Sequence, residues 1–411
     1  MKAILSIFLL LMHLIAASAS TLEVGAGKKY ATIKAAVEAA KDGDIILIYQ
    51  ATYAEGEITI NKQIQLKGIN WPVLDGVNKS QILNVVTDNV IIEGLDIRNC
   101  GYSSSYDWAA IKVLDGNRVI IRNNRLFNNS FGINLQNTSF CRIENNYIKG
   151  NPINEVQSGN AIHCWKSNNV SVVNNVLTGH RDGIYFEFVT HSFIGNNNSY
   201  KNIRYGLHFM FSNDDTYYKN IFKANGSGVA VMFSKRVNMF WNRFEESWGS
   251  AAYGILMKEI SDGKVEHNTF LKNTVGIYME GTNRIHVAQN TFKSNGWAMR
   301  VQSSCDDNSI TRNNFMGNTF DVGTNGTMQL NKFYTNYWDK YEGYDLNKDG
   351  VGDVHYLPVS LYSMIVEKIP AATLLLRSFM VSILDKAERV IPSITPINLK
   401  DEKPFMKPLP L

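Results

Sequence analysis

The sequence is poor in several features that mark common classes of protein. Its 411 residues carry a formal net charge of only +4, and they contain no dense block of lysine and arginine. A protein that binds nucleic acid needs many cations to neutralise phosphates, so this balance argues against such a partner. Proline is scarce until the C-terminal tail, where residues 392–411 hold five of the nine prolines. That composition predicts an extended, poorly ordered tail.

Cysteine is also rare, although an exported protein can pair cysteines in disulfides. The four cysteines fall at different offsets in the repeat described below, so stacking of the repeat units brings no two of them together. We therefore expect mostly free, buried thiols among the four cysteines, which are Cys100, Cys141, Cys164 and Cys305.

The first 19 residues are typical of a secretory signal. Lys2 supplies a positive start, residues 4–15 are apolar, and Ala17-Ser18-Ala19 has the pattern of a cleavage site. The apolar run is too short to span a membrane. No cysteine follows the cleavage site, so a lipid anchor is not expected. We therefore expect an exported protein.

From about residue 80 to residue 320 the chain repeats a pattern, mostly every 22 or 23 residues. A small residue occupies position zero of each unit, and apolar residues occupy positions one and three. This alternation is typical of a strand with one buried face. Position zero is Ala110, Gly132, Ala161, Gly183, Gly206, Gly228, Gly254, Gly276 and Ala298.

Asparagine recurs 14 residues after position zero in eight consecutive units. Stacked amides hydrogen-bond to one another along a turn. So long a register predicts an all-β fold, namely a right-handed parallel β-helix with coils of about 22 residues. The recurring residues are Asn124, Asn146, Asn175, Asn197, Asn220, Asn242, Asn268 and Asn290.

Longer spacings indicate inserted loops at one corner of the coils. Residues 98–109, 149–160 and 245–253 all lengthen the connection between the asparagine turn and the next position zero. Loops on a rigid scaffold often carry function, and these three are expected to wall the face of the strand that follows them. Tolerated insertions at a permissive corner are the alternative.

The two ends of the chain depart from the repeat. Residues 30–41 predict a short helix and residues 45–49 a strand, which is typical of a cap over the first coil. Residues 361–391 predict a C-terminal helix whose charged residues exclude a membrane span, so it either covers the open coil or docks on a partner or membrane surface. The predicted organisation is a signal peptide at 1–19, the cap and first coils at 20–75, the β-helix at 76–360, the C-terminal helix at 361–391 and the tail at 392–411.

A polar loop near the end of the repeat has the spacing of a calcium-binding loop. Asp345, Asn347 and Asp349 alternate before Gly350, which supplies oxygen ligands and a sharp turn. The usual glutamate at the twelfth position is missing, and Asp353 is its candidate substitute. Calcium is the expected ligand, with a simple polar turn as the alternative.

Positions two and four of the repeat point outward, so one face of the stacked strands carries their side chains. Stacking places Met210 beside Met232 on neighbouring rungs, with His208 next to Met210. Two thioethers and an imidazole are soft, uncharged donors that suit Cu(I). We therefore predict a copper site at these three residues, with Glu187 and His163 as further candidate ligands.

Other interpretations of the chain remain open. Methionines also form adaptable protein-binding patches, and the tail or a loop could cover this one. Several β-helix proteins are carbohydrate-active lyases, hydrolases or epimerases, and Asp214-Asp215 and Asp306-Asp307 offer paired carboxylates. No third acid stacks beside the first pair, no Gly-His-Gly follows it, and the chain contains no Arg-x-Lys. An enzyme is therefore the weaker alternative.

The chain resembles the NosD family, the periplasmic maturation proteins of nitrous oxide reductase. The resemblance runs from about residue 22 to residue 390. The coil repeat alone is shared by many β-helix proteins, whereas Met-Phe-Ser rungs combined with the C-terminal motifs are much more specific. The segments that carry the resemblance are the opening module, Gly206–Ser212, Val231–Ser234, Asn336-Tyr337-Trp338-Asp339 and Asp345–Asp353.

The resemblance implies a periplasmic protein that is peripheral to the inner membrane and has no catalytic site of its own. In that family the protein works with an ABC-type ATPase and a membrane subunit, which we expect to bind through the C-terminal region. Together they help to deliver copper to the copper–sulfur centre of nitrous oxide reductase, and a small copper chaperone is the donor. A copper-free assembly platform is the alternative.

Overall fold

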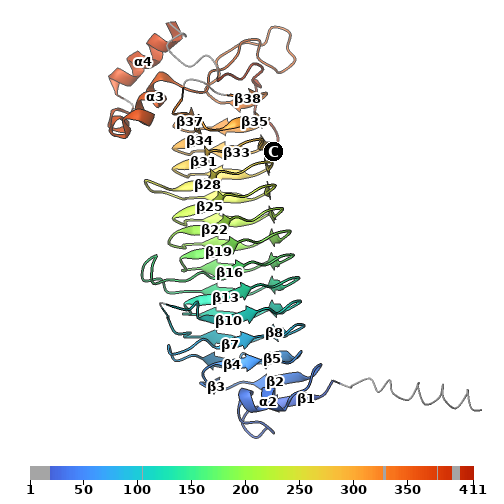
Figure 1. The fold of residues 1–411 in the computed structure, drawn as a ribbon. Coiled ribbons are helices and arrows are strands. Elements are labelled where there is room, and N and C mark those ends of the chain that lie inside the picture. Colours follow the sequence, from blue (N-terminus) through green and yellow to red (C-terminus); the bar gives the residue numbers. More distant parts are fainter. Residues whose placement is uncertain (1–18, 104, 327–329, 377, 391–398) are drawn as a thin grey trace, which may run out of the picture.

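The chain winds into a long rod of stacked coils, with a helical segment at its C-terminal end (Figure 1). This computed structural model describes residues 19–103, 105–326, 330–376, 378–390 and 399–411. The predicted signal peptide lies outside the described residues except for Ala19. The architecture is the right-handed parallel β-helix that the repeat predicts, because every strand pairs in parallel with the equivalent strand of the next coil.

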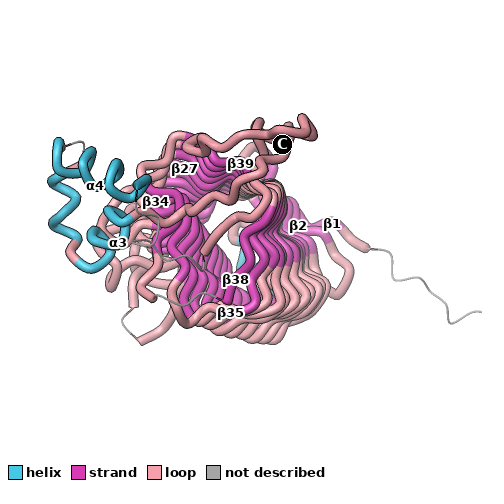
Figure 2. Tube along the Cα trace, turned by 90° about the horizontal axis from the view of Figure 1, so that it is seen from above, coloured by secondary structure: helices cyan, strands magenta, loops and turns pink. Residues whose placement is uncertain are grey.

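Three parallel sheets form the sides of the rod, and successive coils superpose when it is viewed along its axis (Figure 2). Sheet A has fourteen strands: β1 (Thr21–Val24), β2 (Ile45–Tyr49), β5 (Gln65–Ile69), β8 (Ile91–Glu93), β11 (Ile120–Arg122), β14 (Arg142–Glu144), β17 (Ser171–Val173), β20 (Phe193–Gly195), β23 (Thr216–Tyr218), β26 (Asn238–Phe240), β29 (Lys264–Glu266), β32 (His286–Ala288), β35 (Asp306–Thr311) and β38 (Leu330–Tyr334).

Sheets B and C complete each coil. Sheet B has thirteen strands: β3 (Thr52–Tyr53), β6 (Val73–Asp75), β9 (Asp96–Arg98), β12 (Arg125–Phe127), β15 (Tyr147–Lys149), β18 (Val176–Thr178), β21 (Asn198–Tyr200), β24 (Ile221–Lys223), β27 (Arg243–Glu245), β30 (Thr269–Leu271), β33 (Thr291–Lys293), β36 (Asn314–Met316) and β39 (Tyr337–Trp338). Sheet C has twelve: β4 (Ile58–Ile60), β7 (Leu83–Val85), β10 (Ala109–Leu114), β13 (Phe131–Gln136), β16 (Ile162–Trp165), β19 (Asp182–Glu187), β22 (Tyr205–Met210), β25 (Ser227–Met232), β28 (Tyr253–Lys258), β31 (Val275–Glu280), β34 (Trp297–Val301) and β37 (Phe320–Gly323).

The core is a continuous column of side chains that stack from coil to coil. Positions one and three of the repeat lie in sheet C and are almost completely buried, as predicted. Inside sheet B a column of five phenylalanine rings has centroids 4.7 to 5.4 Å apart, and Trp338 ends it 4.0 Å from Phe315. Each buried aromatic ring removes a large apolar area from water, so the column stabilises the whole length of the rod.

The asparagine ladder forms as predicted at the turn between sheets A and B. The Nδ2 of each asparagine donates to the Oδ1 of its counterpart one coil further on, at 2.9 to 3.1 Å. Asn313 and Asn336 extend the ladder by two coils. Because these amides are buried, the mutual hydrogen bonds offset the cost of removing them from water.

The N-terminal cap agrees with the prediction. Helix α2 (Ile33–Ala39) begins at Thr32, whose hydroxyl accepts from the N–H of Ala35, and β2 follows as the expected strand. Ile33, Ala36 and Val37 are buried against the first coils. The helix therefore covers the apolar end of the rod.

The C-terminal segment is not the single helix that the sequence predicts. It contains α3 (Leu361–Lys368), the 3-10 helix η1 (Pro370–Leu375) and α4 (Phe379–Val390). Proline disfavours helical backbone at the residue before it, and Ile369 has φ −132° and ψ 84°. The break at Pro370 therefore turns one long helix into a compact helical segment beside sheet C (Figure 2).

The described part of the tail, residues 399–411, is ordered rather than loose, which corrects the prediction for this segment. Asp401 is fully buried at the end of the rod. Its carboxylate accepts from the backbone N–H groups of Thr335 and Asn336, the Nδ2 of Asn336 and the Nε1 of Trp338, at 2.8 to 3.0 Å. The tail therefore closes the last coil and terminates the asparagine ladder.

The three loop insertions all lie at the corner that connects sheet B to sheet C, as predicted (Figure 1). They follow β9, β15 and β27 and precede β10, β16 and β28. The four cysteines are free and buried, again as predicted. The rod is thus a regular scaffold with its irregular segments gathered at one corner.

Candidate functional site

The outer face of sheet C carries the two predicted thioether ligands. β22 pairs with β25 in a register that sets Met210 opposite Met232, so the predicted stacking is confirmed. Both side chains are half-buried. Glu187 lies one coil before Met210 and Lys258 one coil after Met232 in the same column. The Oη of Tyr185 lies 3.5 Å from the Sδ of Met210.

The neighbouring imidazoles are not surface groups, which corrects the prediction of an exposed column at position two. His208 is only 5% exposed and His163 only 8%. His163 lies between the rings of Phe131 and Tyr185, with centroids 5.7 and 4.9 Å away, and Tyr185 in turn lies 4.8 Å from His208. Bulky rings on rungs so close together cover one another, so outward-pointing side chains become buried.

A charged group holds His208 in place. The guanidinium of Arg204 makes two hydrogen bonds, of 2.7 and 3.1 Å, to the buried carboxylate of Asp182. The same guanidinium lies 3.1 Å from the Nδ1 of His208. Since arginine only donates, Nδ1 accepts and Nε2 carries the proton in the neutral ring. The Nε2 atom has no hydrogen-bond partner among the residues that the structure describes.

Burial keeps both imidazoles neutral. It lowers the pKa of His163 to about 4, with the positive charge of Arg181 acting in the same direction. Burial also lowers the pKa of His208, although Asp182 opposes the shift. Within the described part of the chain, neither nitrogen of His163 has a hydrogen-bond partner. Neutral imidazole is the form that binds metals, so this face combines two thioethers with two uncharged imidazole rings.

No group of three or more histidine, cysteine, aspartate and glutamate side chains gathers to hold a metal within the described parts of the chain. The donors on sheet C fit a soft ion better than a hard one, because the two side chains that lie opposite each other there are methionine thioethers. Trp165, one coil before Glu187, is half-buried and lies under the ammonium of Lys166 at 4.4 Å.

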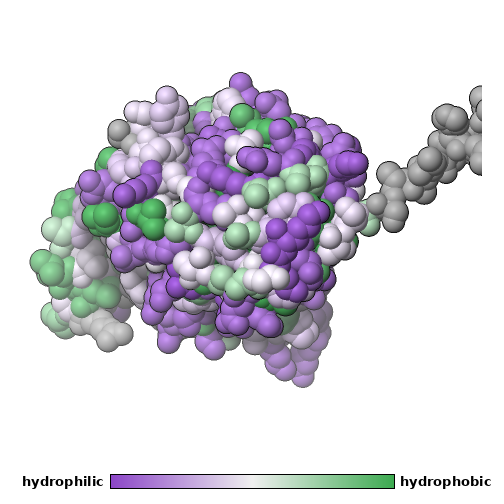
Figure 3. Space-filling view, turned by 90° about the horizontal axis from the view of Figure 1, so that it is seen from below, coloured by the Kyte–Doolittle hydropathy of each residue, from purple (hydrophilic) through white to green (hydrophobic). Residues whose placement is uncertain are grey.

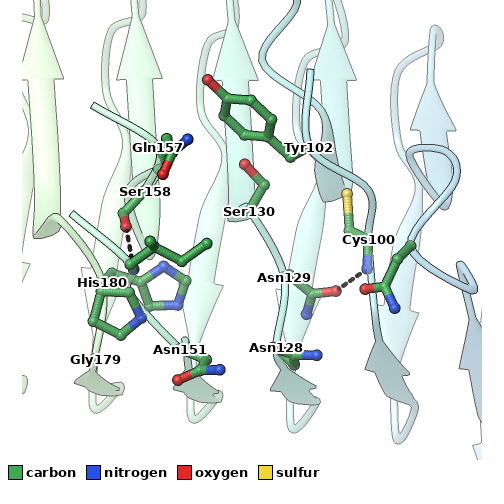
Figure 4. A pocket seen from close by; sticks show the side chains of 14 residues that line it. Cys100, Tyr102, Asn128, Asn129, Ser130, Asn151, Gln157, Ser158, Gly179 and His180 are labelled. Atoms are coloured by element: carbon green, nitrogen blue, oxygen red, sulfur yellow. Dashed lines mark hydrogen bonds between the residues drawn. The ribbon is translucent and has the colours of Figure 1, made fainter. Parts of the chain in front are cut away.

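Sequence reasoning missed a cavity at the corner between sheets B and C, shown in Figure 4. It has a volume of about 300 Å³ and is lined by the loops around Tyr102 and Ser158, with Cys100 and His180 at its walls. Burial raises the pKa of Cys100 to about 12 and lowers that of His180 to about 4. The cavity is therefore lined by neutral groups. Two of the three loop insertions form this cavity, so their position at one corner was the sequence signal that could have indicated it.

The predicted calcium residues form a compact exposed turn. The carboxylate of Asp345 accepts from the N–H groups of Asp349 and Gly350, at 3.2 and 2.8 Å. The Asn347 amide donates to Asp349, and Asp353 accepts from the N–H of Leu346. These bonds account for the turn without a metal, and calcium at this loop stays a prediction.

The aspartate pairs considered for glycoside hydrolysis do not form one acidic site. Asp214 is partly exposed and paired with Arg236, whereas Asp215 is fully buried and accepts from the N–H of Ser192. The second pair, Asp306 and Asp307, is exposed. Two carboxyl groups that act on one glycosidic bond must face a common cleft, and Asp214 and Asp215 do not.

Comparison with known proteins finds similarity to one family. Residues 148–347 match a family model described as "Periplasmic copper-binding protein (NosD)", and residues 56–159 match a right-handed β-helix region. A relative from Stutzerimonas stutzeri, "Probable ABC transporter binding protein NosD", is 26% identical over 375 residues, or 86% of this chain and 85% of the relative. The chain is therefore similar to the NosD family over most of its length. A Pseudomonas aeruginosa NosD of the same description is 27% identical over 89% of each chain.

Solved structures share the fold with this chain but only distant sequence similarity. The catalytic unit of a GH87 α-1,3-glucanase from Streptomyces thermodiastaticus superposes with a TM-score of 0.60 at 12% identity, over 79% of this chain and 69% of the glucanase. PfbA, a surface adhesin of Streptococcus pneumoniae, gives 0.52 at 13% identity, over 74% and 85%. One neighbour is an enzyme and the other an adhesin, so the fold alone assigns no activity.

The C-terminal helices expose a large apolar surface. Figure 3 shows hydrophobic side chains on this projecting segment, whereas the coils beside it are mostly hydrophilic. No helix in the described ranges is long and apolar enough to cross a bilayer. The exposed apolar residues of this segment are Ile369, Leu374, Leu375, Leu376, Phe379, Met380, Ile383 and Val390.

Proposed function

We propose that this protein is a periplasmic, copper-handling accessory protein of nitrous oxide reductase maturation. It holds Cu(I) on the outer face of sheet C and, with an ABC-type ATPase and a membrane subunit, delivers the ion for the copper–sulfur centre of the reductase. Similarity to the family model supports the copper and periplasmic parts of this proposal, and the names of the relatives support association with an ABC-type complex.

The observation that carries the proposal is the stacked pair of Met210 and Met232 beside the unpaired Nε2 of His208. Thioethers bind Cu(I) without adding charge, and a neutral imidazole completes a soft donor set. Nε2 binds copper only in the other tautomer of the neutral ring, so its proton must move to Nδ1 and the hydrogen bond from Arg204 must break. Glu187 and His163, one and two coils away, are the remaining candidate ligands.

The helical segment supports docking on the membrane subunit. Leu374 is 90% exposed, Phe379 80% and Val390 79%, on a segment anchored to the rod by α3. A contiguous apolar surface of this kind marks a binding site on a protein that otherwise faces water. Its position at one end of the rod leaves sheet C free to meet a copper donor and the reductase.

An anaerobic Cu(I) competition titration tests the proposal. The wild-type protein is expected to bind one equivalent tightly. The Met210→Leu/Met232→Leu variant keeps the side-chain volume but lacks both thioethers, and its affinity is expected to fall about tenfold or more.

The matched control is Met316→Leu/Met380→Leu, since both residues are accessible methionines away from this face. The control should bind like the wild type. A wild-type protein that binds no Cu(I) would instead indicate a copper-free assembly platform, and equal loss in both variants would place the site elsewhere.

A further inference from the structure

Three phenylalanines occupy an unfavourable backbone conformation beside the methionine pair. Phe188, Phe211 and Phe233 have φ values of 54°, 50° and 52°, at the turn between sheets C and A. This left-handed region suits glycine and asparagine, and a bulky side chain there is strained. The equivalent turn residue is Asn137 in one coil and Gly281 in another. Phenylalanine at three consecutive coils is therefore not explained by the needs of the turn.

The three rings form a ridge, which we call the Phe ridge, on the surface of the rod. The ring of Phe211 lies 5.1 Å from that of Phe188 and 5.1 Å from that of Phe233, at interplanar angles of 9° and 15°. Phe188 is 45% exposed and Phe211 39%. Large apolar side chains normally avoid such exposure, so the ridge combines two costs to stability in one place.

The Phe ridge borders the proposed copper site. Each phenylalanine directly follows Glu187, Met210 or Met232 in the chain. The backbone N–H of Phe188 donates to the carbonyl of Met210, and that of Phe211 to the carbonyl of Met232, at 3.1 and 3.2 Å. These bonds fix the ridge to the strands that carry the thioethers, so its position relative to them is rigid.

Opposite charges mark the two ends of the ridge. The same turn position holds Lys166 in the coil before Phe188 and Glu259 in the coil after Phe233, both in the left-handed conformation. An apolar centre with a charged rim is the usual anatomy of a protein interface. Unlike charges at the two ends also allow only one orientation of a partner along the rod.

We propose that the Phe ridge is the docking surface for the protein that brings Cu(I) to the methionine pair. This inference rests on the proposed function. The partner presents an apolar patch beside its own soft-metal ligands, with an acidic group facing Lys166 and a basic group facing Glu259. Contact along the ridge excludes water at the thioethers, so the ion passes between thiol, thioether or imidazole donors without release into solution.

Copper transfer measured from two sources tests the inference. The copper-loaded chaperone of the same organism requires docking, whereas a Cu(I)–ferrozine complex does not. The variant is Phe188→Asn/Phe211→Asn/Phe233→Asn, because asparagine already occupies this turn at Asn137. Anaerobic stopped-flow transfer from the chaperone is expected to slow about tenfold or more and to lose saturation with chaperone concentration, while transfer from ferrozine stays unchanged.

Phe140→Asn is the matched control, since Phe140 is 58% exposed with φ 58° but lies off the ridge. It should behave like the wild type with both sources. Circular dichroism checks that all variants fold, and the single variant Phe211→Asn replaces the triple variant if the latter does not. Unchanged transfer from the chaperone, or equal loss from both sources, would overturn the docking role alone. No uptake by the wild type from either source would overturn the proposed function itself.

Discussion

At the scale of the single residue, Asp215 is the clearest conflict between burial and charge. Its side chain is enclosed by the core, where Oδ1 accepts from the N–H of Ser192 at 2.8 Å and Oδ2 has no partner in the described ranges of the chain. Burial raises the pKa of Asp215 to about 8, with the nearby charge of Asp214 adding to the shift. The carboxyl group is therefore protonated in the folded protein at neutral pH, whereas in the unfolded chain it ionises near pH 4.

The Asp215→Asn variant is expected to be more stable than the wild type, and increasingly so as pH rises. Between about pH 4 and pH 8 the unfolded wild-type chain has released a proton that the folded protein retains, so its free energy of unfolding falls with pH. Asparagine keeps an acceptor for Ser192 and does not titrate. The upper bound on the gain at pH 7 is about 4 kcal/mol. Denaturant unfolding at pH 5 and pH 8 measures it.

Asp214→Asn is the control for this prediction. Asp214 is partly exposed and paired with Arg236, so its removal should change stability by less than about 1 kcal/mol, without a trend over this pH range. Parallel stability curves for the wild type and Asp215→Asn would contradict the assignment of a protonated carboxyl group.

The contacts and burial of individual side chains were the features least predictable from sequence. The period-two pattern placed Met210 and Met232 in register because strand pairing follows directly from the repeat. It also placed His208 on the outer side of the strand, but it gave no sign that Arg204 and neighbouring rings bury it. Those contacts come from positions outside the pattern. Ligand geometry therefore needs the structure, even where the column is evident from sequence.

At the scale of the element, the helical segment depends on a few contacts with the last coils. The guanidinium of Arg300 on β34 binds the carboxylate of Glu367 on α3, and the Glu367 side chain is only 8% exposed. Phe320 on β37 packs between the rings of Trp297 and Tyr362. One ion pair and one aromatic cluster therefore anchor the proposed docking segment.

Glu367→Gln is expected to loosen α3 without unfolding the rod. Removal of one charge from a largely buried pair leaves the other without compensation, and such changes typically cost about 3 kcal/mol. Hydrogen exchange of residues 361–368 should therefore accelerate while the coils keep their protection. Glu280→Gln is the matched control, because its ion pair with Lys258 is exposed on both sides. Unchanged exchange in α3 would show that the aromatic cluster alone anchors it.

Sequence predicted the elements well wherever a local rule applied. The cap helix predicted over residues 30–41 forms over Ile33–Ala39 with Thr32 as its N-cap, and the loop insertions follow from the spacing of the repeat. The helix predicted over residues 361–391 was too long, because the backbone leaves helical geometry at Ile369, directly before Pro370 and after the eight residues of α3. An amphipathic, apolar stretch does not show by itself where a proline breaks it, and tertiary contacts decide that position.

At the scale of the whole molecule, the tail determines how the rod ends. Strands β38 and β39 would present free backbone groups and the Nε1 of Trp338 if residues 399–411 were absent. An open strand edge of this kind pairs readily with other chains. The tail is therefore a cap, and its prolines limit any further strand growth at that end.

Deletion of residues 399–411 is expected to cause self-association and a lower melting temperature. Light scattering coupled to size-exclusion chromatography should detect oligomers that grow with protein concentration. Asp401→Asn is the finer variant, because an amide places donors where four N–H groups need an acceptor. Glu402→Gln, with an exposed side chain, is the control and should stay monomeric. A monomeric deletion variant would show that the last coil needs no cover.

The global fold was predictable because each coil pairs with the next one about 22 residues along the chain. The binding of the tail to the last coil was not predictable, since Asp401 contacts Asn336 across 65 residues and the tail has no periodicity. A composition rich in proline predicts an extended backbone, which the tail has, but it does not predict where that backbone binds.

The asparagine ladder gives the rod a dipole along its axis. Every amide donates from Nδ2 toward the C-terminal end and accepts at Oδ1 from the N-terminal side. The side-chain dipoles therefore add along the axis, as peptide dipoles add in an α-helix, and the positive end lies at the last coil. There the chain supplies an anion of its own, the carboxylate of Asp401. The final bond of the ladder is thus also a charge–dipole interaction, oriented by all the coils beneath it.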